Sequence, residues 1–170
     1  FEEYPHRRKA DDIVAFTPSN ADFSYTAADL MAYFADKPIS QLLLINPDNP
    51  SGNMITAADV LTLAAWCRER GVQLILDESF VDFCEEWQTS SMLRNDILEA
   101  NPNMVVVKSI SKSFGVPGLR LGVLASSDEQ VIADIKRDVA IWNINSFGEF
   151  FMQIFNKYEK DYRKACARFQ

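Results

Sequence analysis

Residues 70–78 carry the pattern that decides the fold: a helix end, a glycine, a short apolar segment and two acids, in the order Arg70-Gly71-Val72-Gln73-Leu74-Ile75-Leu76-Asp77-Glu78. Upstream, Thr56 is followed three residues later by Asp59, which is a typical helix start. We therefore expect a helix that runs from Thr56 to Arg70 and stops at Gly71. Residues 72–76 are almost continuously apolar, as in a strand covered on both faces. A helix that leads directly into such a strand is typical of an α/β layer structure.

The same pattern recurs along the chain. Short apolar segments predict strands at residues 13–16, 41–45, 72–76, 104–107 and 120–125. Thr26 with Asp29 predicts another helix start. A final helix over about residues 146–170 is indicated by an apolar stripe at intervals of three or four, formed by Phe147, Phe151, Ile154, Tyr158 and Tyr162. We predict an α/β fold of three layers, with a mostly parallel sheet flanked by helices.

The composition is that of a folded chain of about one domain. Of its 170 residues, 48% are hydrophobic, and 17 Lys and Arg stand against 24 Asp and Glu, a formal net charge of −7. This acidic balance without basic runs argues against a nucleic-acid partner or an anionic membrane, and no apolar run is long enough to span a bilayer. Three cysteines, an odd number without close pairing, argue against a disulfide framework, and the single histidine excludes the usual zinc sites. We expect a cytoplasmic protein without a metal.

Four polar segments lie at the ends of predicted strands, where α/β sheets bind their ligands. They are Asn46-Pro47-Asp48-Asn49-Pro50-Ser51-Gly52, Asp77-Glu78, Ser109-Ile110-Ser111-Lys112 and Gly115-Val116-Pro117-Gly118-Leu119-Arg120-Leu121-Gly122. In the same order, these segments supply a rigidly held amide, an acid, a candidate nucleophilic lysine beside hydroxyls that can bind phosphate, and an arginine that can bind an oxyanion. Each segment alone also fits an ordinary turn, a helix cap or a solvated surface lysine.

Together and in this order, the segments resemble the fold-type I enzymes that use pyridoxal 5′-phosphate (PLP). More narrowly, they are similar to the class I/II aminotransferases, in the branch that contains histidinol-phosphate aminotransferase and threonine-phosphate decarboxylase. The matching motifs are Asn49-Pro50-Ser51-Gly52, Asp77-Glu78-Ser79-Phe80 and Ser109-x-Ser111-Lys112-x-x-Gly115-x-x-Gly118-x-Arg120-x-Gly122. The resemblance implies the large-domain fold of these enzymes, PLP as cofactor, a small-molecule amino acid and 2-oxo acid as substrates, and a homodimer.

The resemblance also implies roles for individual residues. Lys112 would form the internal aldimine with the cofactor aldehyde and then move a proton between the substrate Cα and the cofactor. Asp77 would pair with the pyridine nitrogen and keep it protonated. Asn49 would donate a hydrogen bond to the phenolic oxygen of the cofactor.

The remaining implied contacts concern the phosphate and the ring face. Ser109 and Ser111 would hold the phosphate through their hydroxyls, and Arg120 through its planar cation. Phe1 would stack on the pyridine ring.

Position 80 departs from the family pattern, because the family often has a tyrosine where this chain has Phe80. A tyrosine hydroxyl there would donate to the phenolic oxygen, and Phe80 has none, so the protonated aldimine should be favoured. Asp77-Glu78-Ser79-Phe80 followed by Val81-Asp82-Phe83 is closer to the phosphothreonine decarboxylase-like members than to typical aminotransferases, and Trp142-Asn143-Ile144-Asn145 favours the same branch.

Length is the second departure, because family members are considerably longer than 170 residues. We expect residues 1–170 to form part of a PLP-binding large domain, with the final helix leading toward a small domain beyond the chain. The chain alone should then bind PLP poorly and turn over little substrate.

Three functions stay open from the sequence. The leading one is a PLP-dependent aminotransferase that moves an amino group between an amino acid and a 2-oxo acid. The second is a PLP-dependent decarboxylase of a phosphorylated amino acid. The third, for the isolated chain, is a non-catalytic fragment or scaffold module. A nicotinamide nucleotide site is disfavoured, because no G-x-G-x-x-G follows a predicted strand.

Overall fold

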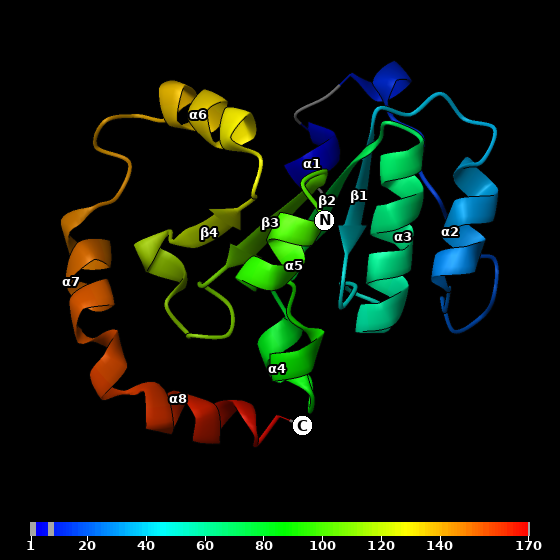
Figure 1. Cartoon of the computed structure of the whole chain (residues 1–170). Helices are drawn as coiled ribbons and strands as arrows, with labels where there is room; N and C mark the ends of the chain where they lie inside the picture. The colour runs from blue at the N-terminus through cyan, green and yellow to red at the C-terminus, as the bar shows by residue number, and fades with distance from the viewer. Residues whose placement is uncertain (1–2, 7–8, 170) are drawn as a thin grey trace.

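A computed structural model of the chain describes residues 3–6 and 9–169 (Figure 1). The four strands are β1 (Gln41–Ile45), β2 (Gln73–Asp77), β3 (Met104–Ser109) and β4 (Gly122–Ala125). The α-helices are α1 (Glu3–His6), α2 (Ala27–Phe34), α3 (Ala57–Glu69), α4 (Trp87–Ser90), α5 (Asn95–Ala100), α6 (Glu129–Asp138), α7 (Ser146–Ile154) and α8 (Glu159–Cys166). Short 3₁₀ turns lie at Ala10–Asp12, Val81–Phe83, Pro117–Leu119 and Phe155–Lys157.

The strands form one mixed sheet in the order β1-β2-β3-β4. β1, β2 and β3 are parallel, with Ile45 opposite Asp77 and Asp77 opposite Val107. β4 is antiparallel to β3, and its first residue, Gly122, lies opposite Ser109. The carboxyl ends of the three parallel strands and the start of β4 therefore meet at one edge. The predicted mostly parallel sheet flanked by helices is confirmed.

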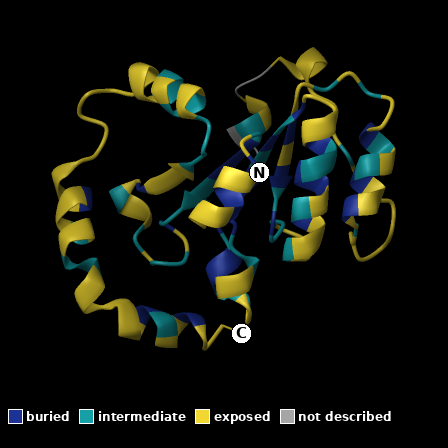
Figure 2. Cartoon of the chain, viewed as in Figure 1, coloured by how far each residue is buried: buried dark blue, intermediate teal, exposed yellow. Residues whose placement is uncertain are grey.

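Helices α2, α3 and α5 pack on one face of the sheet and enclose the core, which is the buried zone seen in Figure 2. Leu63 of α3 and Leu74 of β2 are fully buried there. Local chemistry fixes the helix ends as the sequence predicts: the Thr26 hydroxyl accepts from the backbone N–H of Asp29, whose carboxylate accepts from the backbone N–H of Thr26. Gly71 follows α3 with φ +67°, a left-handed conformation that glycine adopts without strain.

Coverage of the sheet is less complete than the apolar strand segments predict. The central strands β2 and β3 are buried or half-buried on both faces, whereas Leu43 of β1 and Leu124 of β4 are each 39% exposed. No helix in the described part of the chain is long and apolar enough to cross a membrane.

The prediction of a strand at residues 13–16 is wrong. This segment is extended but pairs with no described strand, and Ile13 and Val14 are exposed. Phe16 instead packs edge-on against the rings of Tyr25 and Tyr33, 5.7 and 5.2 Å away between centroids. An extended apolar segment becomes a strand only where a neighbouring strand accepts its hydrogen bonds, and none lies there.

The last predicted strand and helix need smaller corrections. β4 begins at Gly122 rather than at residue 120, because Arg120 has a left-handed backbone (φ 54°) that no strand accommodates. The single helix predicted over about residues 146–170 is interrupted by the Phe155–Lys157 turn, so that α7 and α8 run in different directions (Figure 1). The turn allows Tyr162 of α8 to stack on Phe114, whereas Phe147 stays exposed. The predicted stripe is therefore not one buried face.

Candidate functional site

The polar segments predicted at the strand ends converge at the edge where β1, β2 and β3 end. The backbone N–H of Asn46 donates to the carbonyl oxygen of Asp77, and the N–H of Glu78 donates to that of Val107, each at 2.9 Å. These bonds extend the parallel ladder past the strand ends. The segments that begin at Asn46, Asp77 and Ser109 are thus held side by side.

Asp77, the last residue of β2, is 2% exposed and lies at the centre of this edge. Its Oδ1 accepts from the backbone N–H of Ser79 at 2.9 Å and from the Ser79 hydroxyl at 2.5 Å. Its Oδ2 accepts from the Tyr4 hydroxyl of α1 at 2.6 Å. These donors hold the buried carboxylate in one orientation.

Tyr4 is a site residue that sequence reasoning missed. Partial burial, together with the hydrogen bond to Asp77 and the charge of its carboxylate, raises the pKa of the Tyr4 hydroxyl well above its ordinary value. The hydroxyl therefore stays protonated and continues to donate. A tyrosine in a polar segment 73 residues before its partner shows no signal in the sequence, and only the folded chain brings the two together.

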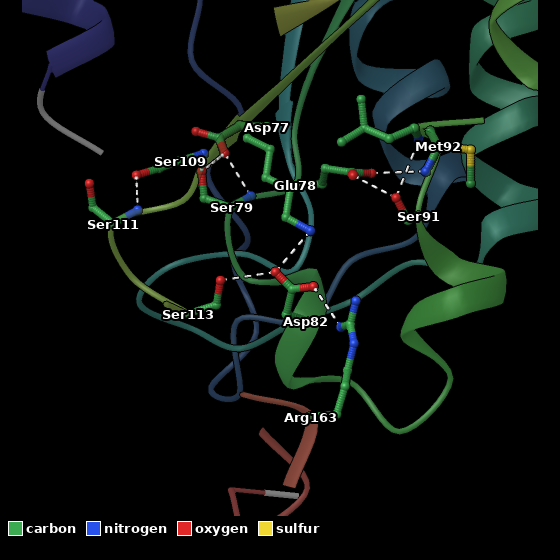
Figure 3. Close-up of polar contacts among 12 residues, drawn as sticks. Asp77, Glu78, Ser79, Asp82, Ser91, Met92, Ser109, Ser111, Ser113 and Arg163 are labelled. Atoms are coloured by element: carbon green, nitrogen blue, oxygen red, sulfur yellow. Dashed lines mark hydrogen bonds and ion pairs between the residues drawn. The ribbon is translucent and has the colours of Figure 1, made fainter. Parts of the chain in front are cut away.

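A chain of hydroxyl contacts links Asp77 to the predicted phosphate-binding serines (Figure 3). The Ser79 hydroxyl donates to Asp77 and accepts from the backbone N–H of Ser109 at 2.9 Å. The Ser109 hydroxyl in turn accepts from the N–H of Ser111 at 3.3 Å, and Ser111 is buried. One hydrogen-bond network thus connects Asp77 through Ser79 to Ser109 and Ser111.

Glu78 points away from this network and serves the fold. Its two carboxylate oxygens accept from the Ser91 hydroxyl at 2.6 Å and from the backbone N–H of Met92 at 2.8 Å, as Figure 3 shows. Burial raises the pKa of Glu78. Neighbouring residues of an extended chain point to opposite sides. Asp77 therefore faces the candidate site, whereas Glu78 fixes the loop before α5.

Asn49 and Phe80 lie together on the wall of a pocket of about 280 Å³ beside the end of β1. Asn46 fixes the base of the loop that carries Asn49: its side chain donates to the carbonyl oxygen of Ile55 at 3.0 Å and accepts from the N–H of Ile55 at 2.9 Å. The rest of the wall is formed by Pro47, Asp48, Pro50, Gly52, Phe83 and Cys84. The pocket brings together Asn49, which the resemblance assigns to the phenolic oxygen of the cofactor, and Phe80, at the position where the family often has a tyrosine that donates to the same atom.

Lys112 follows Ser111 on a turn, and its side chain is exposed. Among the described residues, no hydrogen bond or ion pair to its ammonium group is found. Arg120 is also exposed, and its guanidinium lies 3.5 Å from the carbonyl oxygen of Pro117 rather than on the two serines. Phe1 lies outside the described residues. The structure therefore brings together Asp77, Ser109 and Ser111, and separately Asn49 and Phe80. The described part of the chain holds no group of His, Cys, Asp or Glu side chains that could bind a metal.

Comparison with known proteins gives relatives that include decarboxylases and aminotransferases. The chain is 32% identical to L-serine phosphate decarboxylase of Sulfurospirillum multivorans over 92% of its length and 43% of that protein's. It is 27% identical to histidinol-phosphate aminotransferase of Vibrio campbellii over 67% of its length and 31% of that protein's. A solved structure of a decarboxylase from Sulfurospirillum multivorans matches with a TM-score of 0.76 and 28% identity, covering 92% of this chain and 45% of the other.

The chain thus spans less than half of the length of each of these relatives. The model of one protein family, aminotransferase class I and II, matches residues 8–160, which is most of the chain. The chain therefore belongs to the class I and II aminotransferase family, whose cofactor is pyridoxal 5′-phosphate.

Proposed function

We propose that this chain is part of the large domain of a PLP-dependent enzyme that acts on an amino acid. The observation that carries the proposal is the network from Asp77 through Ser79 and Ser109 to Ser111, which ends one residue before Lys112. It joins a buried acid and two hydroxyls along one edge of the sheet, and the exposed Lys112 follows Ser111 directly in the chain.

The residues present fit the cofactor. Asp77 supplies a buried carboxylate for a protonated ring nitrogen, and its Oδ2, which accepts a hydrogen bond from the Tyr4 hydroxyl, has a second lone pair. Asn49 and Phe80 line a pocket beside the same edge, with an amide donor and a ring face. The Lys112 amine is exposed and so accessible to an aldehyde.

Each residue has one task in this proposal. Lys112 would hold the cofactor aldehyde through Nζ and would move a proton to or from the substrate Cα. Asp77 would hold the proton on the ring nitrogen, and Asn49 would donate to the phenolic oxygen. Ser109, Ser111 and Arg120 would bind the phosphate, and Phe1, which lies outside the described residues, would be the ring-stacking aromatic. When bound, the cofactor supplies an electron sink for the bond that breaks at Cα.

The leading reaction is transfer of the amino group to a 2-oxo acid, as in the histidinol-phosphate aminotransferases among the relatives. A second candidate is decarboxylation of a phosphorylated amino acid, which is favoured by the 32% identity to L-serine phosphate decarboxylase. We propose small-molecule substrates, no nucleic-acid or membrane partner, and a homodimer for the complete polypeptide.

Covalent labelling tests the cofactor role of Lys112. PLP is added to the complete polypeptide that contains this chain, borohydride is added, and the modified peptide is located by mass spectrometry. We expect a pyridoxyl group on Lys112 that is lost in Lys112→Ala. Lys108, which is ion-paired in the structure, is the internal control. Specific labelling of Lys108, or labelling that persists in Lys112→Ala, contradicts the proposal.

The products separate the two reactions. The complete polypeptide is incubated with PLP, a 2-oxo acid and either unmodified or phosphorylated amino acids. Formation of a new 2-oxo acid supports amino transfer. Release of CO₂ with a phosphorylated amine as product supports decarboxylation and refutes the leading reaction.

A further inference from the structure

A charge cluster around a buried carboxylate contacts the turn that carries Lys112. Asp82, in the Val81–Phe83 turn, is 2% exposed, and its Oδ2 lies 2.8 Å from the Lys108 ammonium. The Ser113 hydroxyl donates to the same oxygen at 2.9 Å. Arg163 of α8 places a guanidinium nitrogen 3.6 Å from the Asp82 Oδ1 (Figure 3). We call Asp82, Lys108, Ser113 and Arg163 the Asp82 cluster.

The cluster holds the chain on both sides of Lys112. Lys108 lies four residues before it, in β3, and Ser113 follows it directly. A single carboxylate oxygen therefore joins the strand before Lys112 to the turn after it. Lys112 itself stays outside the cluster, with an exposed side chain. The backbone around the amine is thus fixed, whereas the amine remains available.

Aromatic packing reinforces the same turn from α8. The Phe114 ring stacks on the Tyr162 ring with centroids 4.1 Å apart and planes within 12°. The next residue of α8, Arg163, packs over the ring of Trp87 at 3.6 Å. Side chains of α8 therefore contact the turn after Lys112 and the segment after Asp82 together.

Asp82 has the charge that this arrangement needs. Burial alone would raise its pKa, but the Lys108 ammonium and the Ser113 hydroxyl outweigh it and hold the pKa of Asp82 below its ordinary value. The carboxylate stays ionised, with a hydrogen bond from the Ser113 hydroxyl and ion pairs to Lys108 and Arg163. A buried ionised group with several partners fixes geometry more strictly than apolar contacts do, because the loss of a partner leaves the charge less well compensated in a low-dielectric interior.

We propose that Asp82 is a positioning residue that acts through Lys108 and Ser113 to hold the Lys112 amine in its reactive place. The inference rests on the proposed function, because it assigns Asp82 a part in the reaction of Lys112. It extends that function to a residue that contacts neither Lys112 nor the Asp77 network in the structure. Arg163 makes this positioning depend on α8, which lies far along the chain.

Three variants separate positioning from general stability. Asp82→Asn removes the charge, and Ser113→Ala removes the bond to Asp82 nearest Lys112 and leaves the Asp82–Lys108 ion pair intact. Ser113→Ala thus keeps the proposal testable even where Asp82→Asn does not fold. Asp134→Asn, an exposed acid of α6 paired with Arg137, is the matched control.

The first measurement is hydrogen–deuterium exchange without cofactor. Amides of residues 110–116 should exchange at least about tenfold faster in Asp82→Asn and Ser113→Ala, whereas those of β1 and β2 should keep the exchange rates of the parent protein. The control should match the parent protein throughout. Unchanged exchange over residues 110–116 in Ser113→Ala overturns the proposal.

The second measurement is kinetic, on the complete polypeptide with PLP. Both variants should lower kcat by roughly ten- to a hundredfold while KM stays within about twofold, because a displaced catalytic amine costs rate and not substrate binding. Parallel losses in kcat and substrate affinity overturn positioning. Failure of the proposed function is distinguishable, because Lys112 would then carry no pyridoxyl label whatever the exchange shows.

Discussion

Tyr4→Phe tests whether α1 is held on the sheet by one hydrogen bond to the candidate active-site acid. The substitution removes the Tyr4 hydroxyl, which donates to the Asp77 Oδ2 at 2.6 Å, and leaves the ring in place. The Asp77 Oδ1 keeps both bonds from Ser79. The variant therefore deletes one donor to a buried carboxylate and no packing.

The magnitude follows from the charge of the acceptor. A hydrogen bond to an ionised group contributes about 1.5–3 kcal/mol. Tyr4 is only half-buried, so water can partly replace its hydroxyl. We expect the free energy of unfolding to fall by about 1–2 kcal/mol. For a chain of this length, this corresponds to a Tm lower by roughly 2–8 °C.

Urea unfolding followed by far-UV circular dichroism measures this loss as a shift in midpoint at constant m value. Tyr158→Phe, which deletes a hydroxyl from an exposed ring, is the matched control and should change stability by less than about 0.5 kcal/mol. Equal stability of Tyr4→Phe and the parent protein refutes the reasoning, because the bond would then contribute nothing in solution.

The difference in stability between the parent protein and Tyr4→Phe should depend on pH. The pKa of the Tyr4 hydroxyl is raised in the fold, so its stabilising contribution is complete below the unfolded value of about 10 and is lost as the pH rises through the folded value. The stability difference between the parent protein and Tyr4→Phe should therefore shrink above pH ~10. A constant difference across that range contradicts the raised pKa.

Three further outcomes are expected. Leu63→Ala, in the fully buried face of α3, should lower the free energy of unfolding by about 2–5 kcal/mol in the same urea assay, and a loss below about 1 kcal/mol would contradict its packing. Thr26→Ala removes the capping box of α2 and should cost about 0.5–2 kcal/mol, whereas a neutral effect would show that the cap does not stabilise the helix. Phe80→Tyr supplies a hydroxyl donor in the pocket that Asn49 lines, so the pH midpoint of the visible absorption of the Lys112-bound cofactor should fall, and an unmoved midpoint rejects this role for position 80.

Local sequence patterns predict the frame of the fold, because local chemistry decides it. The capped starts at Thr26 and Thr56 and the stop at Gly71 depend only on residues within one helical turn. The middle residues of β1, β2 and β3 form continuous apolar runs, and burial of such segments needs helices on the sheet. Polar segments follow these strands in the sequence, and parallel topology alone brings the carboxyl ends of the strands, and so these segments, to the same edge of the sheet. For this reason Asp77, Ser109 and Ser111 could be predicted as neighbours.

What the sequence alone determined is therefore the α/β class, the family motifs and the edge of the sheet that bears them, since each depends on short-range order or on strand direction. Tertiary structure alone decided which distant side chains complete that edge. Tyr4 reaches Asp77 across 73 residues, and α8 brings Arg163 and Tyr162 to the turn of Lys112. It also decided that residues 13–16 form no strand and that the last helix breaks at Phe155–Lys157. Such contacts depend on how whole elements pack, and no interval along the chain encodes them.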